Sequence, residues 1–309
     1  MSLLKCISLS DGSVVSPPSA SVVCLGNFDG VHLAHRALMQ EALLLRKKNF
    51  PDAVCGVFCF SNPSSDYLSP AQPAHLSTLE QKAEIFAQIG MEYLFLTHFP
   101  DVQALTPAVF VKEILQNQCH CVAAVCGFNY RFGKSGGGNP ETLQKLLDAP
   151  VSVQNEICLN GKTVSSTEIR RLLTDGQAEE AATLLTRPYS FTAEVVHGKS
   201  LGHTIGVPTV NQYFPQKMLI PRHGVYITDC KIDGKIYRGV SNVGVHPTVD
   251  NDARVNCETH LLDLSQDLYG KRIQICFLKF LRPEKKFDSL DALCKQLQAD
   301  IRAAKSYLS

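Results

Sequence analysis

The segment 26–35, which reads GNFDGVHLAH, constrains the fold of this chain more than any other stretch of its sequence. It follows the apolar residues 22–25 and precedes a stretch of helical character, so it predicts a strand, a tight turn and a helix. Glycines let backbone amides approach a ligand closely, and the start of a helix carries partial positive charge. His32 and His35, three residues apart, would point from the first helical turn at one anion. The segment therefore predicts a nucleotide-phosphate site; the alternative is an ordinary turn with two solvated histidines.

The first half of the chain alternates short apolar segments with longer helical ones. This alternation predicts an α/β fold whose parallel sheet is covered on both faces. Ligands of such sheets bind beyond the carboxyl ends of the strands, where residues 26–35 and 127–133 fall. The expected strands are residues 22–25, 53–60, 93–97, 121–127 and 151–154, and the expected helices are residues 35–48, 78–89, 107–117, 141–147 and 167–174.

The pattern changes after residues 187–189. Strand-like runs follow one another with short turn signals between them, such as Asp233-Gly234, which predicts an antiparallel sheet or a small barrel. The expected strands are residues 191–197, 225–232, 236–243, 255–262 and 273–281, followed by an amphipathic helix over residues 290–307. The boundary is expected within residues 176–188, giving an α/β domain over residues 1–182 and an all-β domain over residues 183–309.

The composition excludes several classes of partner. The 309 residues are enough for two cores, and a net charge of +1 with 19% charged residues favours neither nucleic acid nor an anionic membrane. No apolar run approaches the ~20 residues that span a bilayer. The first thirteen residues lack the long apolar segment of a signal peptide, so we expect a cytoplasmic protein.

Twelve cysteines without a secretion signal indicate reduced thiols rather than disulfides. The densest group is Cys119, Cys121 and Cys126 around His120. It lacks the paired short spacings of a zinc site, so we expect small buried apolar residues there and no metal.

A second loop motif, residues 127–133 (GFNYRFG), follows an expected strand. Its aromatic rings can sandwich a base, and Arg131 can meet a phosphate. The alternative is an aromatic corner of the core.

A third motif is residues 165–170, SSTEIR. Ser165 and Glu168 fit the spacing of a helix capping box. The functional interpretation adds hydroxyl and backbone donors, with Arg170 aimed at a phosphate.

In the second half, residues 206–211 (GVPTVN) follow a loop that contains glycine and histidine. A turn fixed by proline that presents a hydroxyl and an amide can hold Mg²⁺ and phosphate oxygens. The alternative is a turn in which Thr209 and Asn211 bond the local backbone.

The last motif, residues 256–260 (NCETH), places a carboxylate in an apolar strand. The period of two puts Glu258 on one face with His260 and opposite Cys257, Thr259 and Leu261. Such a carboxylate is either an ion-pair partner or a general base.

Together these segments resemble the bacterial bifunctional riboflavin kinase/FAD synthetase family over essentially the whole chain. The matching stretches, in order, are GNFDGVHLAH, GFNYRFG, SSTEIR, LTRPY, GVPTVN, PRHGVY, SNVGVHPT, ETHLLD, DLYGK and RPEKKF. The resemblance implies a Rossmann-like nucleotidyltransferase domain that transfers AMP from ATP to FMN, giving FAD. It also implies a six-stranded kinase barrel that transfers the γ-phosphate of ATP to riboflavin, with Mg²⁺ as cofactor.

The resemblance also implies roles for particular residues. His32 and His35 contact the ATP phosphates as catalytic residues, and Glu258 is the base for the ribityl hydroxyl. The implied ATP-binding residues of the first domain are Gly26, Phe28, Asp29, Ser165, Ser166, Thr167 and Arg170, with Asn129 and Arg131 at the flavin and nucleotide site. Those of the kinase are Gly206, Thr209 and Asn211, and the last two are the implied magnesium ligands.

Three positions differ from the family pattern, all in the first half: Ala34 replaces the glycine of H-x-G-H, Asn129 replaces a frequent aspartate, and residues 61–63 lack a histidine. One alternative function is therefore a riboflavin kinase with a weakened adenylyltransferase domain. Another is a catalytically inactive flavin-binding regulator, although a pure binder needs no general base. The expected partners are the small molecules ATP, riboflavin and FMN.

Overall fold

The computed structural model describes residues 4–10, 20–62, 65–68, 73–197, 207–245, 254–264 and 266–307. The chain divides into two compact units. The first comprises Met1–Pro73 and Ser77–Ser165, and the second comprises Ala74–Leu76 and Ser166–Ser309.

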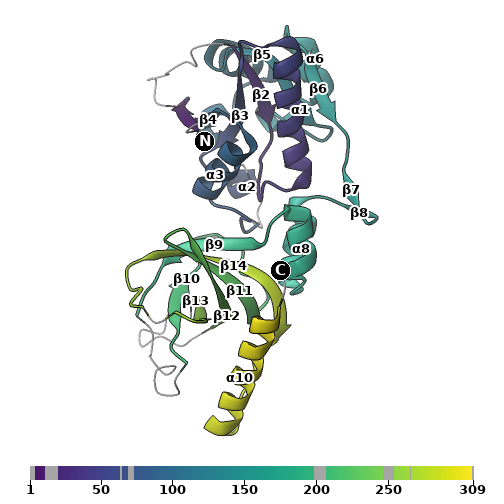
Figure 1. Ribbon diagram of the computed structural model, residues 1–309. Coiled ribbons are helices and arrows are strands. Elements are labelled where there is room, and N and C mark those ends of the chain that lie inside the picture. The colour runs from purple at the N-terminus through teal and green to yellow at the C-terminus, as the bar shows by residue number, and fades with distance from the viewer. Residues whose placement is uncertain are drawn as a thin grey trace. The chain divides into compact units, whose positions relative to one another are not determined.

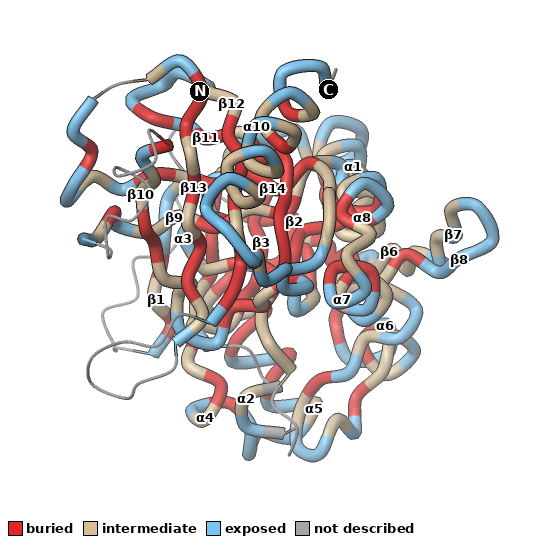
Figure 2. Tube along the Cα trace, turned by 90° about the horizontal axis from the view of Figure 1, so that it is seen from below, coloured by how far each residue is buried: buried red, intermediate tan, exposed pale blue. Residues whose placement is uncertain are grey.

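A six-stranded parallel sheet forms the centre of the first unit (Figure 1). Its strand order is β1-β4-β3-β2-β5-β6, and every neighbouring pair is parallel. The central strand β2 is buried along its whole length (Figure 2). The strands are β1 Lys5–Ser8, β2 Ser21–Leu25, β3 Val54–Phe60, β4 Tyr93–Thr97, β5 Cys121–Gly127 and β6 Val151–Gln154.

Helices cover both faces of this sheet. α1 (Leu33–Asn49) and α3 (Leu79–Ile89) pack on one face, while η1 (Phe110–Gln118) and α6 (Pro140–Leu146) pack on the other. The segment η1 is a π-helix, in which Cys119 N–H donates to the carbonyl of Ile114 at 2.9 Å. The remaining elements are α2 Ser65–Leu68, α4 Phe99–Val102, α5 Pro107–Val109, η2 Lys134–Gly136, β7 Cys158–Leu159 and β8 Lys162–Thr163.

The strand order of the first unit reverses at β2. The chain runs from β2 to β3 and β4 on one side, and then crosses to β5 and β6 on the other. Open parallel sheets bind ligands outside the carboxyl ends of the strands at such a reversal. The segments that leave β2 and β5 there are residues 26–31 and 128–133.

The second unit contains a six-stranded antiparallel sheet of order β10-β13-β12-β11-β14-β9. The sheet curls, because Val196, just after β9, forms an antiparallel bridge with Asn211 of β10. Its strands are β9 Tyr189–Glu194, β10 Val210–Tyr213, β11 Gly224–Ile232, β12 Lys235–Val245, β13 Val255–Leu261 and β14 Arg272–Arg282.

The C-terminal helix α10 (Leu290–Ser306) packs on this sheet (Figure 1). A small apolar cluster joins Ala304 of the helix to Val225, Val240 and Leu278 of the strands. Asp300, only 4% exposed, forms an ion pair with Arg282 at 2.7 Å. The helix is therefore anchored by apolar packing and by a buried charge pair.

Two helices and one short segment complete the second unit. α7 (Ser166–Thr174) packs against α8 (Ala178–Leu185), and α8 packs on β14 and β9. The carbonyl of Leu173 accepts a hydrogen bond from Arg222 N–H at 3.0 Å. His75, from the segment between the two parts of the first unit, bridges to Met218 in a parallel arrangement.

The packing of α7 and α8 in the second unit predicts how stable two C-terminal fragments of the chain should be. A chain of residues 166–309 is expected to be about 3–6 kcal/mol more stable to unfolding than one of residues 183–309. The shorter fragment loses the buried Leu172 and Leu173 of α7, each worth ~1.5–3 kcal/mol, and cuts α8. Denaturant unfolding of the two fragments measures the difference. Equal midpoints would support the expected boundary at 182/183, which otherwise stays a prediction.

The expected α/β and all-β halves are confirmed. Strands β4, β5 and β6 have the predicted bounds, whereas α1 begins two residues earlier, at Leu33. The predicted helix over residues 107–117 is α5 followed by the π-helix η1. Strands β1 and β10 were not predicted, and the segment expected to hold the boundary contains α8.

All twelve cysteines are free thiols. Cys119, Cys121 and Cys126 are buried, as their apolar surroundings predict. Within the described ranges, no helix combines the length and the apolar character needed to cross a membrane.

Candidate active sites

The turn after β2 has an unusual backbone. Phe28 and Val31 have positive φ angles of 51° and 41°, and Gly30 has a φ of 80°. Positive φ is rare for a bulky or β-branched residue and costs free energy, so the surroundings must impose it. The fully buried ring of Phe28 packs on Phe86 at 5.7 Å, and a side chain at position 26 would come within 3.1 Å of it. The predicted binding residue Phe28 thus fixes the turn from within the core.

The start of α3 holds the same turn from the outside. Ser77 Oγ accepts a hydrogen bond from Gly30 N–H at 3.0 Å, and Lys82 Nζ donates to the carbonyl of Asn27 at 3.2 Å. The carboxyl side chain of Asp29 is also buried, with 2% exposure. The turn is therefore held in a single shape before any ligand arrives.

His32 and His35 lie together at the start of α1, as predicted. His32 is the N-cap residue, and its carbonyl accepts the first helical hydrogen bond from Arg36 N–H at 3.0 Å. The two imidazole rings stack with centroids 3.6 Å apart and planes 16° from parallel. Such stacking brings both rings to one side of the helix, where they can contact one anion.

The environment of His35 favours its neutral form. Burial, followed by the neighbouring His32 and Lys82, lowers the pKa of His35 well below its ordinary value of 6.5. Its Nδ1 is buried and has no hydrogen-bond partner among the described residues. A buried ring nitrogen of this kind has hydrogen-bonding capacity to offer a ligand that enters the site.

In the loop after β5, some of the aromatic residues are buried and one is exposed. Phe132 is buried and stacks on Tyr130 at 5.7 Å, which is the aromatic corner considered as an alternative. Phe128 is half exposed, and Asn129 and Arg131 are exposed. Because β2 and β5 are neighbours, this loop and the histidines share one edge of the sheet. Of the three aromatic rings in this loop, that of Phe128 is the exposed one.

The SSTEIR motif begins α7, with Ser165 just before the helix and Glu168 in its first turn. Arg170 Nε donates to the carbonyl of Ala74 at 2.7 Å, and Glu168 pairs with Arg171 at 2.7 Å. The helix belongs to the second unit. The roles of Ser165, Ser166, Thr167 and Arg170 in phosphate binding therefore stay predictions.

Strand pairing in the second unit brings the GVPTVN and NCETH motifs together. Asn211 of β10 lies directly opposite Glu258 of β13, so their side chains share one face. Asn256, two residues away on that face, donates from Nδ2 to Asn211 Oδ1 at 3.1 Å. Its Oδ1 is buried without a hydrogen-bond partner among the described residues. The predicted alternation is confirmed, since Cys257, Thr259 and Leu261 are buried and Glu258 and His260 are half buried.

His260 positions the segment that carries Thr209. Its Nδ1 lies 2.8 Å from the carbonyl oxygen of Pro208, and a carbonyl only accepts, so Nδ1 carries the proton. This hydrogen bond holds the backbone just before Thr209 against β13, the strand that carries Glu258. The sequence signal for this contact is His260 of the NCETH motif, the residue to which the sequence analysis assigns no role. Gly206 lies outside the described residues.

A second carboxylate, Glu284, lies on the same face of the sheet. Asn242 of β12 lies directly opposite Glu258 on the other side of β13, and its Nδ2 donates to Glu284 Oε1 at 3.0 Å. Any side chain at Gly244 would overlap the Glu284 carboxyl group. Glycine at position 244 is what allows this carboxylate to approach.

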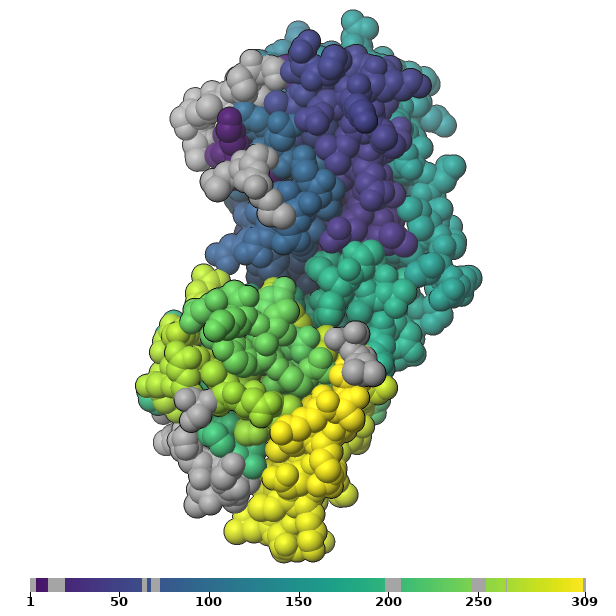
Figure 3. All heavy atoms as spheres, viewed as in Figure 1, coloured from purple at the N-terminus to yellow at the C-terminus, as the bar shows by residue number. Residues whose placement is uncertain are grey.

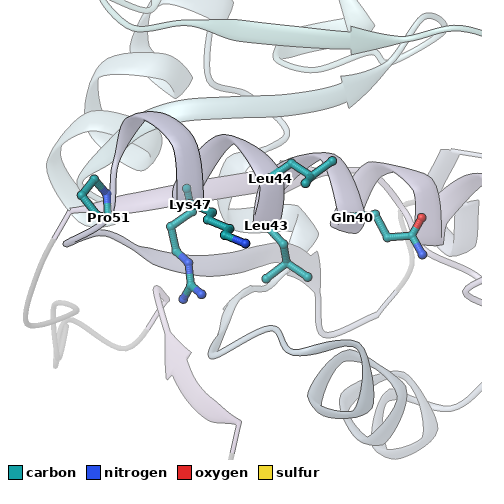
Figure 4. A pocket seen from close by; sticks show the side chains of 6 residues that line it. Gln40, Leu43, Leu44, Lys47 and Pro51 are labelled. Carbon is teal, nitrogen blue, oxygen red and sulfur yellow. The ribbon is translucent and has the colours of Figure 1, made fainter.

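A hollow on the outer surface of α1 contains none of these residues. It is lined by Gln40, Leu43, Leu44, Arg46, Lys47 and Pro51 (Figure 4). These residues belong to the later turns of α1 and the segment just after it, whereas His32 precedes the first turn. α1 lies on the surface of the first unit, and Leu44 is 61% exposed (Figure 3). This hollow is therefore separate from the turn after β2.

The first unit thus presents two stacked histidines at the reversal of a parallel sheet, and the second presents a carboxylate beside two amides on a curled β-sheet. The family model described as FAD synthetase matches residues 15–168, and the model described as riboflavin kinase matches residues 185–308.

Curated relatives match nearly the whole chain. The bifunctional riboflavin kinase/FMN adenylyltransferase of Listeria monocytogenes is 34% identical over 294 residues, covering 93% of this chain and 92% of that protein. The protein of the same name from Escherichia coli K12 is 34% identical over 298 residues, with 94% of each chain covered. The chain belongs to the bifunctional riboflavin kinase/FMN adenylyltransferase family.

One solved structure matches both units. It is titled a macrolide-efflux protein from Streptococcus pneumoniae, has a TM-score of 0.91 and 30% sequence identity, and covers 99% of this chain and 100% of that chain. The match shows a shared fold, while the family assignment rests on the sequence relatives.

Proposed function

We propose that the second unit phosphorylates riboflavin at the face that carries Glu258. The ribityl hydroxyl oxygen attacks the γ-phosphorus of ATP, Glu258 accepts the hydroxyl proton, and ADP leaves. The observation that supports this best is the strand register, which sets Asn211 directly opposite Glu258. General-base catalysis requires the carboxylate to lie within hydrogen-bond reach of the reacting hydroxyl, and a rigid β-sheet is suited to holding it there.

We propose Thr209 and Asn211 as the residues that would hold Mg²⁺. Their hydroxyl and amide oxygens, beside the carboxylate of Glu258, are the hard donors that this ion prefers. The amide oxygen of Asn256, which has no hydrogen-bond partner in the described part of the chain, adds a further hard acceptor nearby. When bound, Mg²⁺ would neutralise part of the negative charge of the ATP phosphates. Asn256 orients the amide of Asn211, and His260 holds the backbone before Thr209.

We propose that the first unit converts FMN and ATP to FAD and pyrophosphate at the turn after β2. A phosphate oxygen of FMN attacks the α-phosphorus of ATP, and the bond to the β-phosphate breaks. His32 and His35 donate hydrogen bonds to the phosphate oxygens on which charge develops. Asn129, Arg131 and Phe128, on the neighbouring strand end, are the proposed contacts to the flavin and nucleotide. We also propose a cytoplasmic location, which the twelve free thiols support.

Product analysis tests both activities together. Incubation of the full chain with riboflavin, ATP and Mg²⁺ is expected to give FMN first and FAD later, because the chain carries both of the proposed sites. Separation of the flavins by liquid chromatography follows both steps. FMN that accumulates without FAD at excess ATP would support the alternative of a kinase with a weakened adenylyltransferase. Riboflavin that stays unchanged would support the flavin-binding regulator.

A further inference from the structure

Lys82 on α3 is a buried cation that the reaction scheme does not yet use. Its side chain is only 3% exposed, although a lysine in a surface helix normally reaches solvent. Its Nζ donates to a carbonyl, that of Asn27, and no carboxylate of the described residues lies within ion-pair distance. A buried ammonium group is costly unless it is paired, so this charge is only partly compensated.

The helix does not need Lys82 in order to form. The first turn of α3 has its own capping box, in which Thr78 Oγ1 accepts from Gln81 N–H and Gln81 Oε1 accepts from Thr78 N–H. The apolar face of α3 is supplied by Ile85 and Phe86, which pack in the core. A role in local folding therefore does not account for burying a charge at position 82.

Lys82 lies near the histidine site. Burial is the main cause of the lowered pKa of His35, and the charges of His32 and Lys82 lower this pKa further. Lys82 and Asp29 both act on the buried thiol of Cys59, so the lysine and the carboxylate of the turn lie near the same strand. The charged and titratable groups that act on His35 thus come from the turn (His32) and from α3 (Lys82).

We propose that Lys82 is a positioning residue of the adenylyl-transfer site, which fixes the turn through Asn27 and places a positive charge near His35 for the triphosphate of ATP. This inference rests on the proposed function of the first unit. A fixed ammonium group costs no reorganisation when the phosphate charge arrives, and it leaves His35 neutral and able to donate. The carbonyl contact at Asn27 and the hydroxyl contact at Gly30 together hold both ends of the turn.

The first measurement is the titration of His35 in the full chain by NMR, without any substrate. In Lys82→Met, the pKa of His35 is expected to rise toward its ordinary value, because one of the charges that lowers it is gone. Lys82→Arg keeps the charge and should keep the low pKa. Lys48→Met removes an exposed lysine of α1 in the same unit and should leave the titration unchanged.

The second measurement is FAD formation from supplied FMN. Lys82→Met is expected to raise KM for ATP about tenfold or more, the effect of losing a charged hydrogen-bonding group. Lys82→Arg should restore most of this loss, and riboflavin phosphorylation should not change. If Lys82→Met fails to fold, as denaturant unfolding would show, Lys82→Gln serves in its place.

Two results would overturn the inference. One is an unchanged titration of His35 in folded Lys82→Met, and the other is an unchanged KM for ATP in the same variant. A wild-type chain that makes no FAD would instead overturn the proposed function, while the NMR titration would still test the electrostatic effect of Lys82 on His35.

Discussion

Replacing Glu258 by glutamine is expected to lower the rate of FMN formation by about 10²–10⁴, the usual effect of removing a general base. The amide has nearly the same size as the carboxylate and can remain in β13 opposite Asn211. It cannot accept the proton of the ribityl hydroxyl. The loss should therefore appear in kcat at saturating riboflavin and ATP, measured by chromatography of the flavins.

The chain offers two controls for this experiment. FAD formation from supplied FMN should persist in Glu258→Gln, because that reaction uses the first unit. Glu194→Gln changes an exposed carboxylate of β9 in the same sheet and should leave both rates unchanged. A rate of FMN formation in Glu258→Gln within about threefold of wild type would be too small a change for a general base.

The parallel sheet was the easiest part of the fold to predict. Strands β4, β5 and β6 have the predicted bounds, because strands covered on both faces are nearly continuous apolar runs. The edge strand β1 was missed, since it has four residues and begins with the exposed Lys5. β1 pairs with β4 at the edge of the sheet, and this pairing cannot be predicted from the pattern of apolar residues alone.

Strand β10 was missed for a different reason. Its sequence, VNQY, is polar because Asn211 faces Glu258 on one side and Gln212 is fully buried on the other. Both motifs of the kinase site were identified from the sequence, but their distance from one another was not. The register between β10 and β13 is a long-range pairing, and no local pattern encodes it.

The segment around residues 176–188 shows how turn signals can mislead. Asp175-Gly176 and Arg187-Pro188 both indicate loops, yet the eight residues of α8 lie between them. The helix buries Ala178, Ala181, Leu184 and Leu185 against the second unit. Alanine contributes little to an apolar pattern, so a short helix with two leucines resembles a linker.

In the first unit, the sequence predicted the two histidines of the site but not Lys82, which holds the turn beside them. The spacing of His32 and His35 is a local signal, and their rings do lie together at the start of α1. Lys82 gives no signal in sequence, because a lysine at the fourth position of a helix is ordinarily solvated. Its burial depends on the carbonyl of Asn27, 55 residues earlier in the chain.

His32→Ala and His35→Ala are each expected to lower FAD formation from supplied FMN by about 10²–10³, the effect of losing one preorganised donor to developing charge. Riboflavin phosphorylation should remain in both variants, because it takes place in the second unit. The side chain of His32 makes no capping hydrogen bond, so its removal should not cost α1 its N-cap. His120→Asn is the matched control, since His120 is exposed and lies at the amino end of β5, the opposite edge of the sheet.

The rate losses in His32→Ala and His35→Ala distinguish a phosphate-binding site from an ordinary turn with two solvated histidines. Stacked rings at 3.6 Å that share one anion should give losses that are not additive in the double variant, since each ring orients the other. Ala34→Gly should be neutral or mildly activating, because glycine frees the backbone at the family's H-x-G-H position. The rate of FAD formation at saturating FMN and ATP measures all of these variants. Wild-type rates in both alanine variants would mean that the turn after β2 binds no reacting phosphate, and the adenylyl-transfer site would have to be sought elsewhere in the first unit.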